Sequence, residues 1–303
     1  MAVASSLLDL IGNTPLVELR GVQPPGRTLY AKLEGQNPTG SIKDRVALEM
    51  VEAADLEPGQ ELLEPTSGNT GISLALVAKL KGLRLTCVMP ANATPERRTL
   101  LEAYGATIVD SPPEQGSNGA VRAAQELAAS DGRYVMLFQY GNPANPEAHY
   151  RGTGAEIARE LPRVDAVVAG LGTGGTLMGT GARLREAFPD VLVVAAEPLP
   201  GDPVMGLRSL DEGYVPPILD VSKLDRKLLV SNAEAAAAAR ALLQREGLFA
   251  GVSSGAVVHV ARRIAEELPE DAVVVAILAD GGWKYLSADF WRGDEIDEAV
   301  LWW

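Results

Sequence analysis

The feature that most constrains the fold of this chain is a regular alternation of short apolar runs with longer stretches of helical pattern. The runs are rich in β-branched residues, and the stretches between them place apolar residues at helical spacing. We expect strands at 61–64, 84–89, 106–109, 134–139, 164–170, 191–197 and 272–279, and helices at 72–81, 95–104, 117–129, 177–188, 233–246 and 256–268. This order is typical of open, mainly parallel sheets covered by helices. The strands fit two sheets better than one, so the sequence predicts an α/β chain with two domains.

Composition and charge narrow the class of protein further. The 303 residues are 47% hydrophobic and 22% charged, as in soluble globular proteins, and no apolar run is long enough to span a bilayer. The start lacks the pattern of a signal peptide, and Cys87 is the only cysteine, so we expect a cytoplasmic protein. The formal net charge of −13 argues against nucleic acid as a partner. An anionic ligand must therefore be held by local cations and helix ends.

The segment 37–45, with the sequence NPTGSIKDR, places Lys43 in the first turn of a predicted helix. Ser41 and Asp44 fit a capping box, and Val46 and Met50 continue one apolar helical face. The partial positive charge of a helix N-terminus favours the neutral amine of a lysine, which is the form that Schiff-base chemistry requires. Alone, such a lysine is more often a solvated surface charge.

Glycines and hydroxyls follow the predicted strand 164–170, in the segment Gly170-Leu171-Gly172-Thr173-Gly174-Gly175-Thr176. The glycines let the backbone approach a ligand closely, and the next helix offers free N–H groups to a phosphate. The same glycines satisfy the dinucleotide pattern GxGxxG, with Glu197 at the spacing of a ribose-binding acid. A nicotinamide-dependent oxidoreductase is therefore a competing interpretation. The two threonine hydroxyls favour a terminal phosphate instead, and a merely tight turn is a third possibility.

Two more polar segments precede predicted helices. The segment 66–71, TSGNTG, could clamp a carboxylate with hydroxyls, an amide and backbone N–H groups, whereas 251–255 is explained by an ordinary N-cap. These segments, Gln139 and Asp280 all follow predicted strands, so we expect them at the ligand-binding edges of the sheets. His149 and His259 are isolated, and we interpret both as structural rather than as metal ligands.

Together these motifs resemble the fold-type II pyridoxal-phosphate enzymes, a tryptophan synthase β-like group, and specifically the cysteine synthases. The resemblance extends from the segment 11–16, IGNTPL, to 284–287, KYLS. It implies a homodimer whose protomers have a larger cofactor domain, 1–40 plus 146–303, and a smaller substrate-binding domain, 41–145.

The resemblance also implies roles for individual residues, with pyridoxal 5'-phosphate as the cofactor. Lys43 would form the internal aldimine, Asn69 would bond the phenolic oxygen of the cofactor, and Ser253 its pyridine nitrogen. The phosphate would lie in a cup formed by Gly172, Thr173, Gly174, Gly175 and Thr176. The substrate carboxylate would be held by Thr66, Ser67, Thr70 and Gln139.

The implied reaction is a β-replacement. An amino acid displaces Lys43, whose freed amine removes the Cα proton, and the β-substituent leaves to give an aminoacrylate that a sulfur nucleophile converts to L-cysteine. The segment 205–216 is similar to the actinobacterial cysteine synthase B branch, in which the arginine matching Arg208 recognises the phosphate of O-phospho-L-serine. A guanidinium suits a dianionic phosphate better than a neutral acetyl ester. Pairing of Arg208 with Asp211 or Glu212 at the surface is the plainer alternative.

Members of that branch also have a short apolar tail, similar to 299–303, AVLWW, and take sulfur from the C-terminal thiocarboxylate of a small carrier protein. The resemblance implies the same donor here and a tail that shields the active site, although packing of the tail elsewhere explains it equally well. An O-acetylserine sulfhydrylase that uses sulfide or thiosulfate and a catalytically silent binding protein are the remaining alternatives. Asp280 and Trp283 depart from the pattern of the commoner cysteine synthases, and the sequence assigns them no role.

Overall fold

The computed structural model describes residues 3–66, 68–93, 95–286 and 291. The chain divides into two compact units, one formed by Met1–Ile11 and Lys43–Asn145 and the other by Gly12–Ile42 and Pro146–Trp303. Each unit contains its own sheet, and all but one pair of neighbouring strands are parallel. The predicted α/β fold class is therefore confirmed. No helix among these residues is long and apolar enough to cross a membrane.

The smaller unit contains a four-stranded parallel sheet in the order β5-β4-β3-β6. Its strands are β3 (Glu61–Pro65), β4 (Leu85–Pro90), β5 (Thr107–Ser111) and β6 (Tyr134–Met136). Its longer helices are α1 (Lys43–Ala53), α2 (Asn69–Lys81), α3 (Pro95–Tyr104) and α4 (Gly116–Ser130).

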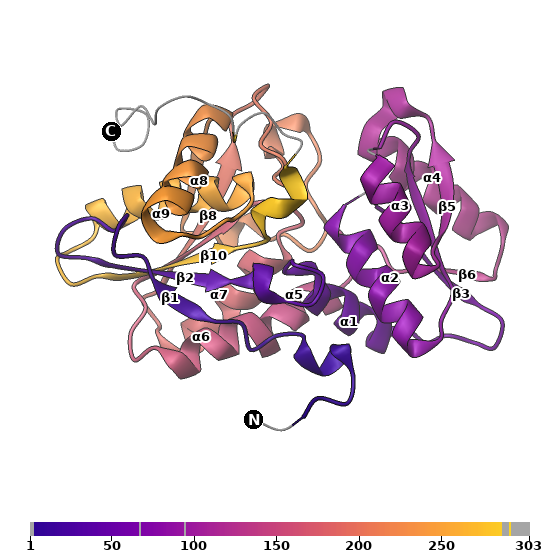
Figure 1. Cartoon of the computed structure of the whole chain (residues 1–303), viewed down its shortest axis with the longest axis horizontal. Coiled ribbons are helices and arrows are strands. Elements are labelled where there is room, and N and C mark those ends of the chain that lie inside the picture. The colour runs from indigo at the N-terminus through magenta and orange to yellow at the C-terminus, as the bar shows by residue number, and fades with distance from the viewer. Residues whose placement is uncertain (1–2, 67, 94, 287–290, 292–303) are drawn as a thin grey trace. The chain divides into compact units, whose positions relative to one another are not determined.

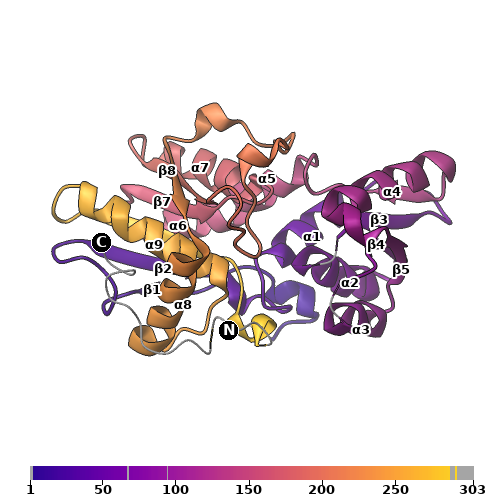
Figure 2. The same cartoon turned by 90° about the horizontal axis from the view of Figure 1, so that it is seen from above.

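Helices cover both faces of this sheet, as Figure 2 shows for α2 and α4. Leu62 and Cys87 point to the face packed by α1, α2 and α3, whereas Leu63 and Val88 point to the face packed by α4. Strands buried on both faces read as continuous apolar runs, which is why β3 and β4 were evident in the sequence. Cys87 is buried, and its burial raises the pKa of the thiol to about 12.

The larger unit contains a six-stranded sheet in the order β1-β2-β10-β7-β8-β9. Its strands are β1 (Leu16–Glu18), β2 (Thr28–Leu33), β7 (Ala166–Gly170), β8 (Leu192–Pro198), β9 (Arg226–Val230) and β10 (Val273–Leu278). Only the pairing of β1 with β2 is antiparallel. The helices are α5 (Ala144–Ala148), which starts at the end of the smaller unit, α6 (Ala155–Glu160), α7 (Gly175–Ala187), α8 (Asn232–Glu246) and α9 (Val252–Glu267), with a π-helix at His149–Gly154.

Alternate residues of the central strands again face two helical layers. Val168 and Ala276 pack under α8 and α9, while Val167 and Ile277 pack against α6 and α7 on the opposite face (Figure 1). The carboxyl ends of β7 and β10 thereby lie at one edge of the sheet, where parallel α/β proteins place their ligands. The loops at this edge carry the glycine segment and Asp280.

Candidate active site

In the smaller unit, the polar segment after β3 forms the start of α2. Gly68 is the N-cap of this helix and Asn69 is its first residue. The hydroxyl oxygen of the buried Thr66 accepts the backbone N–H of Gly71 at 3.2 Å, which folds the segment back over the helix end. Ser67 lies outside the described residues, so its predicted role stays a prediction.

The structure brings two of the predicted carboxylate-binding residues together. Thr70 Oγ1 donates to Gln139 Oε1 at 2.8 Å, and both side chains are buried. The carbonyl of Gln139 accepts from Asn145 Nδ2 at 2.8 Å. The predicted strand 134–139 is too long, because Phe138 adopts a left-handed conformation with φ of 55° and β6 ends at Met136. Gln139 therefore lies in a sharp turn after the strand.

A buried acid that the sequence interpretation missed supports this turn. Glu64 of β3 is fully buried, and its carboxyl oxygens accept the backbone N–H groups of Phe138 at 2.6 Å and Gln139 at 3.1 Å. Burial raises the pKa of Glu64 to about 8, although the two backbone hydrogen bonds oppose the shift. The signal in the sequence was a charged residue inside an otherwise apolar strand, directly before the polar segment.

Lys43 is the first residue of α1 and is half-buried. The residues before it are fixed within the larger unit: Ile42 N–H donates to the carbonyl of Ala279 at 2.8 Å, and Gly281 N–H donates to that of Gly40 at 3.2 Å. Gly40 has φ of +80°, and a Cβ there would lie 2.8 Å from the Trp283 ring. A glycine is thus required where the chain turns toward the lysine.

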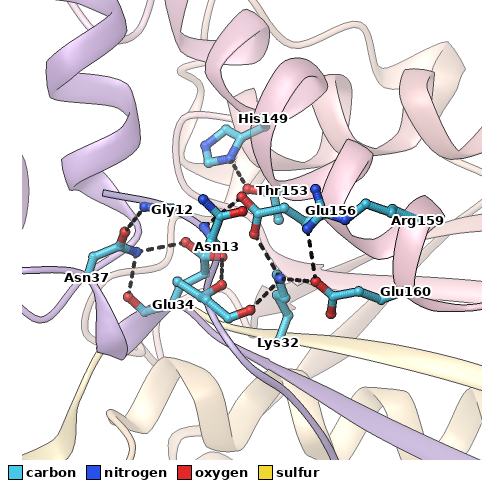
Figure 3. Close-up of polar contacts among 11 residues, drawn as sticks. Gly12, Asn13, Lys32, Glu34, Asn37, His149, Thr153, Glu156, Arg159 and Glu160 are labelled. Carbon is cyan, nitrogen blue, oxygen red and sulfur yellow. Dashed lines mark hydrogen bonds and ion pairs between the residues drawn. The ribbon is translucent and has the colours of Figure 1, made fainter. Parts of the chain in front are cut away.

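A buried polar network includes residues that precede Lys43 in the chain (Figure 3). The ammonium of Lys32, fully buried, contacts Glu156 Oε2 at 2.8 Å and donates to the carbonyl of Thr14 at 2.6 Å. Glu34 accepts from the Thr14 hydroxyl at 2.8 Å and from Asn37 Nδ2 at 2.9 Å. The segment 11–16, which is part of the resemblance to the cysteine synthases, therefore contacts residues that precede Lys43 through Thr14.

In the larger unit, the glycine segment joins β7 to α7 as predicted. Gly174 is the N-cap of α7 with φ of +89°, and a Cβ there would lie 2.9 Å from Leu219. A Cβ at Gly170 would lie 2.4 Å from Leu207. Thr173 is buried, and its hydroxyl accepts the N–H of Gly175 at 3.4 Å. A glycine-rich turn that leads into the first N–H groups of a helix fits a phosphate group.

The other predicted residues of the larger unit lie around this segment. Ser253 is buried in the first turn of α9, near Gly206, where an added Cβ would lie 3.7 Å from its hydroxyl oxygen. The N-cap of α9, Gly251, donates to the carbonyl of Asp280, and the Asp280 carboxylate accepts from the Tyr285 hydroxyl. Asp280 therefore ties the end of β10 to the start of α9.

The loop that carries Arg208 is attached to the glycine segment. The backbone N–H of Arg208 donates to the carbonyl of Leu171 at 2.7 Å, and its guanidinium carbon lies 4.9 Å from the centroid of the Tyr214 ring. Glu197, fully buried at the end of β8, accepts from the backbone N–H of Leu210 at 2.6 Å and pairs with Lys227 at 2.6 Å. The interpretation of Glu197 as a ribose-binding acid is wrong, because its carboxylate anchors this loop.

His149 is also more than an isolated structural residue. Its Nε2 lies 3.2 Å from the hydroxyl of Thr176, one of the predicted phosphate ligands. His259, in contrast, lies 3.7 Å from the carboxylate of Glu234, and its burial lowers the pKa of the imidazole. No cluster of three potential metal ligands occurs among the described residues.

Comparison with known proteins identifies the class that this fold and these segments define. A family model described as pyridoxal-phosphate dependent enzyme matches residues 7–280. A probable cysteine synthase of Bacillus subtilis is 42% identical, over 96% of this chain and 99% of its own length, and cysteine synthase B of Pseudomonas aeruginosa is 43% identical over 93% and 96%.

Solved structures agree with this result. The structure of cysteine synthase from Entamoeba histolytica matches with a TM-score of 0.92 at 32% identity, covering 99% of this chain and 96% of that one. O-ureido-L-serine synthase matches with a TM-score of 0.90 at 40% identity, covering 98% and 99%.

The chain belongs to the pyridoxal-phosphate-dependent enzyme family and, within it, to the homologues of cysteine synthase. It is an enzyme, and its cofactor is pyridoxal 5'-phosphate. The nicotinamide interpretation of the glycine segment is thereby excluded.

Proposed function

We propose that this enzyme forms L-cysteine by β-replacement on O-phospho-L-serine. In this reaction the Cβ–O bond of the substrate breaks, phosphate leaves with the bonding electrons, and a sulfur nucleophile then forms a bond to Cβ. The bound cofactor supplies the electron sink that makes the Cα proton acidic. The cysteine synthases among its relatives support the general activity, which is cysteine synthesis.

We assign each residue of the site a role in this reaction. The amine of Lys43 holds the cofactor covalently and, once displaced, takes the proton from Cα of the substrate. Thr70 and Gln139, with Thr66 and Ser67, hold the substrate carboxylate, and Asn69 bonds the phenolic oxygen. Gly172 to Thr176 hold the phosphate of the cofactor. Ser253 bonds the pyridine nitrogen as a hydroxyl, which makes the ring a moderate electron sink suited to β-elimination.

Arg208 is the residue that supports O-phospho-L-serine as the substrate. Its backbone is bonded to Leu171, the residue before the proposed cofactor phosphate cup, and its guanidinium stacks on Tyr214. The hydrogen bond from the Leu210 N–H to the Glu197 carboxylate anchors the same loop. A guanidinium held in this way can bind a dianionic phosphate through two parallel hydrogen bonds, which an acetyl ester cannot reciprocate.

Substitution of Arg208 tests this assignment. We expect Arg208→Ala to lower kcat/KM for O-phospho-L-serine roughly 100-fold and for O-acetyl-L-serine less than about threefold. Arg226→Ala removes an exposed arginine that pairs with Glu267 and serves as the control. Equal losses for both substrates in the Arg208 variant would contradict the phosphate role and leave an O-acetylserine sulfhydrylase as the alternative.

The proposed sulfur donor is the thiocarboxylate of a small carrier protein, and it rests on the resemblance described above. The segment 299–303, which the resemblance links to shielding of the active site, lies outside the described residues. Cysteine formation with sulfide, thiosulfate and a thiocarboxylated carrier protein should be compared at equal sulfur concentration; a preference for sulfide would refute this part. A cytoplasmic homodimer belongs to the same proposal, and analytical ultracentrifugation tests the dimer.

A further inference from the structure

His149 occupies a fully buried position between two threonines. It is the first residue of the π-helix His149–Gly154, and its Nδ1 lies 3.0 Å from the hydroxyl of Thr153 (Figure 3). Its Nε2 lies 3.2 Å from the hydroxyl of Thr176 in the first turn of α7. The imidazole thus connects the π-helix to a residue of the proposed phosphate cup.

Close packing fixes the position of this imidazole. At Gly179 in α7, an added Cβ would lie 1.9 Å from the carbonyl oxygen of Pro146 and 2.8 Å from Cβ of His149. At Gly154, an added Cβ would lie 2.8 Å from Cβ of Arg183 in α7. Because both glycines let α7 approach the 146–154 segment without intervening side chains, the histidine ring has a defined place against the N-terminal turn of α7.

A role for Thr176 as donor to an anion limits how the three side chains can share their hydrogens. A neutral imidazole has one N–H and one lone pair, and a threonine hydroxyl can donate only one hydrogen. If Thr176 donated its hydrogen to Nε2, none would remain for an anion. If Nε2 carries the hydrogen instead, Thr176 accepts from it and its own hydrogen is free for an anionic oxygen. Nδ1 then accepts from the Thr153 hydroxyl.

We propose that His149, as the neutral Nε2–H tautomer, is a positioning residue that orients the Thr176 hydroxyl as a donor to the cofactor phosphate. The inference rests on the proposed place of this phosphate at Gly172 to Thr176. The π-helix contributes Thr153, whose hydroxyl lies within hydrogen-bond distance of the other ring nitrogen and can donate to it.

Cofactor binding by substituted apoenzymes tests the positioning. His149→Leu removes both ring nitrogens and should weaken pyridoxal 5'-phosphate binding roughly 10-fold to 100-fold, as expected for loss of a charge-assisted hydrogen bond. His149→Gln keeps a side-chain amide that can donate to Thr176 and should restore affinity to within about threefold. Pyridoxal, which lacks the phosphate, should bind equally to all forms. An equal loss for pyridoxal would show general damage and overturn the inference.

The tautomer can be observed directly in the holoenzyme. The chain has two histidines, so a ¹⁵N-labelled imidazole spectrum contains two ring systems, and His259→Gln assigns them. We expect the His149 ring to be protonated at Nε2 alone. A proton on Nδ1, in either the other tautomer or the imidazolium, would overturn the proposal.

One further variant separates this inference from the function on which it rests. Thr176→Val removes the hydroxyl and should weaken pyridoxal 5'-phosphate but not pyridoxal. If this variant binds the cofactor normally, the phosphate does not lie on Thr176 and the cup assignment fails. If it binds weakly while His149→Leu binds normally, the cup stands and only the role of His149 fails.

Discussion

The loop after β3 and the loop after β7 both lead from a parallel strand into a helix, yet they offer a ligand different groups. The loop after β7 presents backbone N–H groups, and its glycines at 170 and 174 leave no room for a Cβ. The region around the loop after β3 presents the side chains of Thr70 and Gln139, which are supported by the buried Glu64. The proposed phosphate site therefore depends on positions without side chains, and the proposed carboxylate site on Glu64, which bonds the backbone of Phe138 and Gln139.

The glycine substitutions that distinguish the two loops should have the largest effect. Gly174→Ala forces a Cβ into a left-handed backbone conformation 2.9 Å from Leu219, whereas a Cβ at Gly68 meets nothing within 4 Å. We expect Gly174→Ala to weaken pyridoxal 5'-phosphate binding on the order of 100-fold and Gly68→Ala less than about threefold. Titration of the apoenzymes with cofactor measures both. Similar losses in the two variants would remove the contrast between the loops.

A smaller effect is expected from substitution of Glu64, the buried acid that supports Gln139. Above about pH 8 Glu64 is ionised and both of its oxygens can accept, whereas in Glu64→Gln the amide nitrogen cannot, so at this pH the backbone N–H of Phe138 or Gln139 loses its acceptor. We expect KM for the amino-acid substrate to rise about 10-fold while cofactor affinity is unchanged. Glu61→Gln, in the same strand and bonded to the Thr86 hydroxyl, is the matched control. An unchanged KM in Glu64→Gln would show that Glu64 does not position Gln139.

The smallest expected effect is on how the free energy of unfolding changes with pH. Burial raises the pKa of Glu64 from 4.5 to about 8, so the folded state keeps a proton that the unfolded state releases between these values. The contribution of this group to stability is full below about pH 4.5 and is lost as the pH rises through 8. Between pH 7 and 8 the free energy of unfolding should fall by about 1 kcal/mol more in the wild type than in Glu64→Gln. Urea unfolding at both pH values measures it, and parallel changes would contradict the shifted pKa.

Strands that form continuous apolar runs could be predicted, whereas three strands of the larger sheet that carry charged residues could not. The sequence analysis found β3, β4, β7, β8 and β10 to within about two residues at each end. It missed β9, which begins with Arg226 and Lys227 at an exposed edge, β2, which contains Lys32, and the three-residue β1, which ends at Glu18. The charge of Lys32 argued against a buried strand because its partner, Glu156, is distant in sequence.

Predictions for site residues depended on whether their partners were local. The segment after β7 has the predicted form because adjacent glycines and threonines define it. The interpretation of Glu197 was wrong, and the contact of His149 with Thr176 was not foreseen, because the partners Leu210 and Thr176 are separated from them in sequence. The end of β6 was misplaced because nothing in the composition of Phe138 indicates a positive φ. Tertiary contacts, rather than local propensity, decide these positions.

The pairing of β2 with β10 has a consequence for synthesis on the ribosome. The smaller unit takes its whole sheet from residues 61–136, so all its strands are available once less than half of the chain has been made. Thr28–Leu33, although translated much earlier, can pair with Val273–Leu278 only near the end of translation. Lys32 lacks its partner Glu156 until about half of the chain has been made, and until then it remains hydrated rather than buried. The first strands to emerge are therefore among the last to reach their native neighbours, and the smaller unit can fold while they wait.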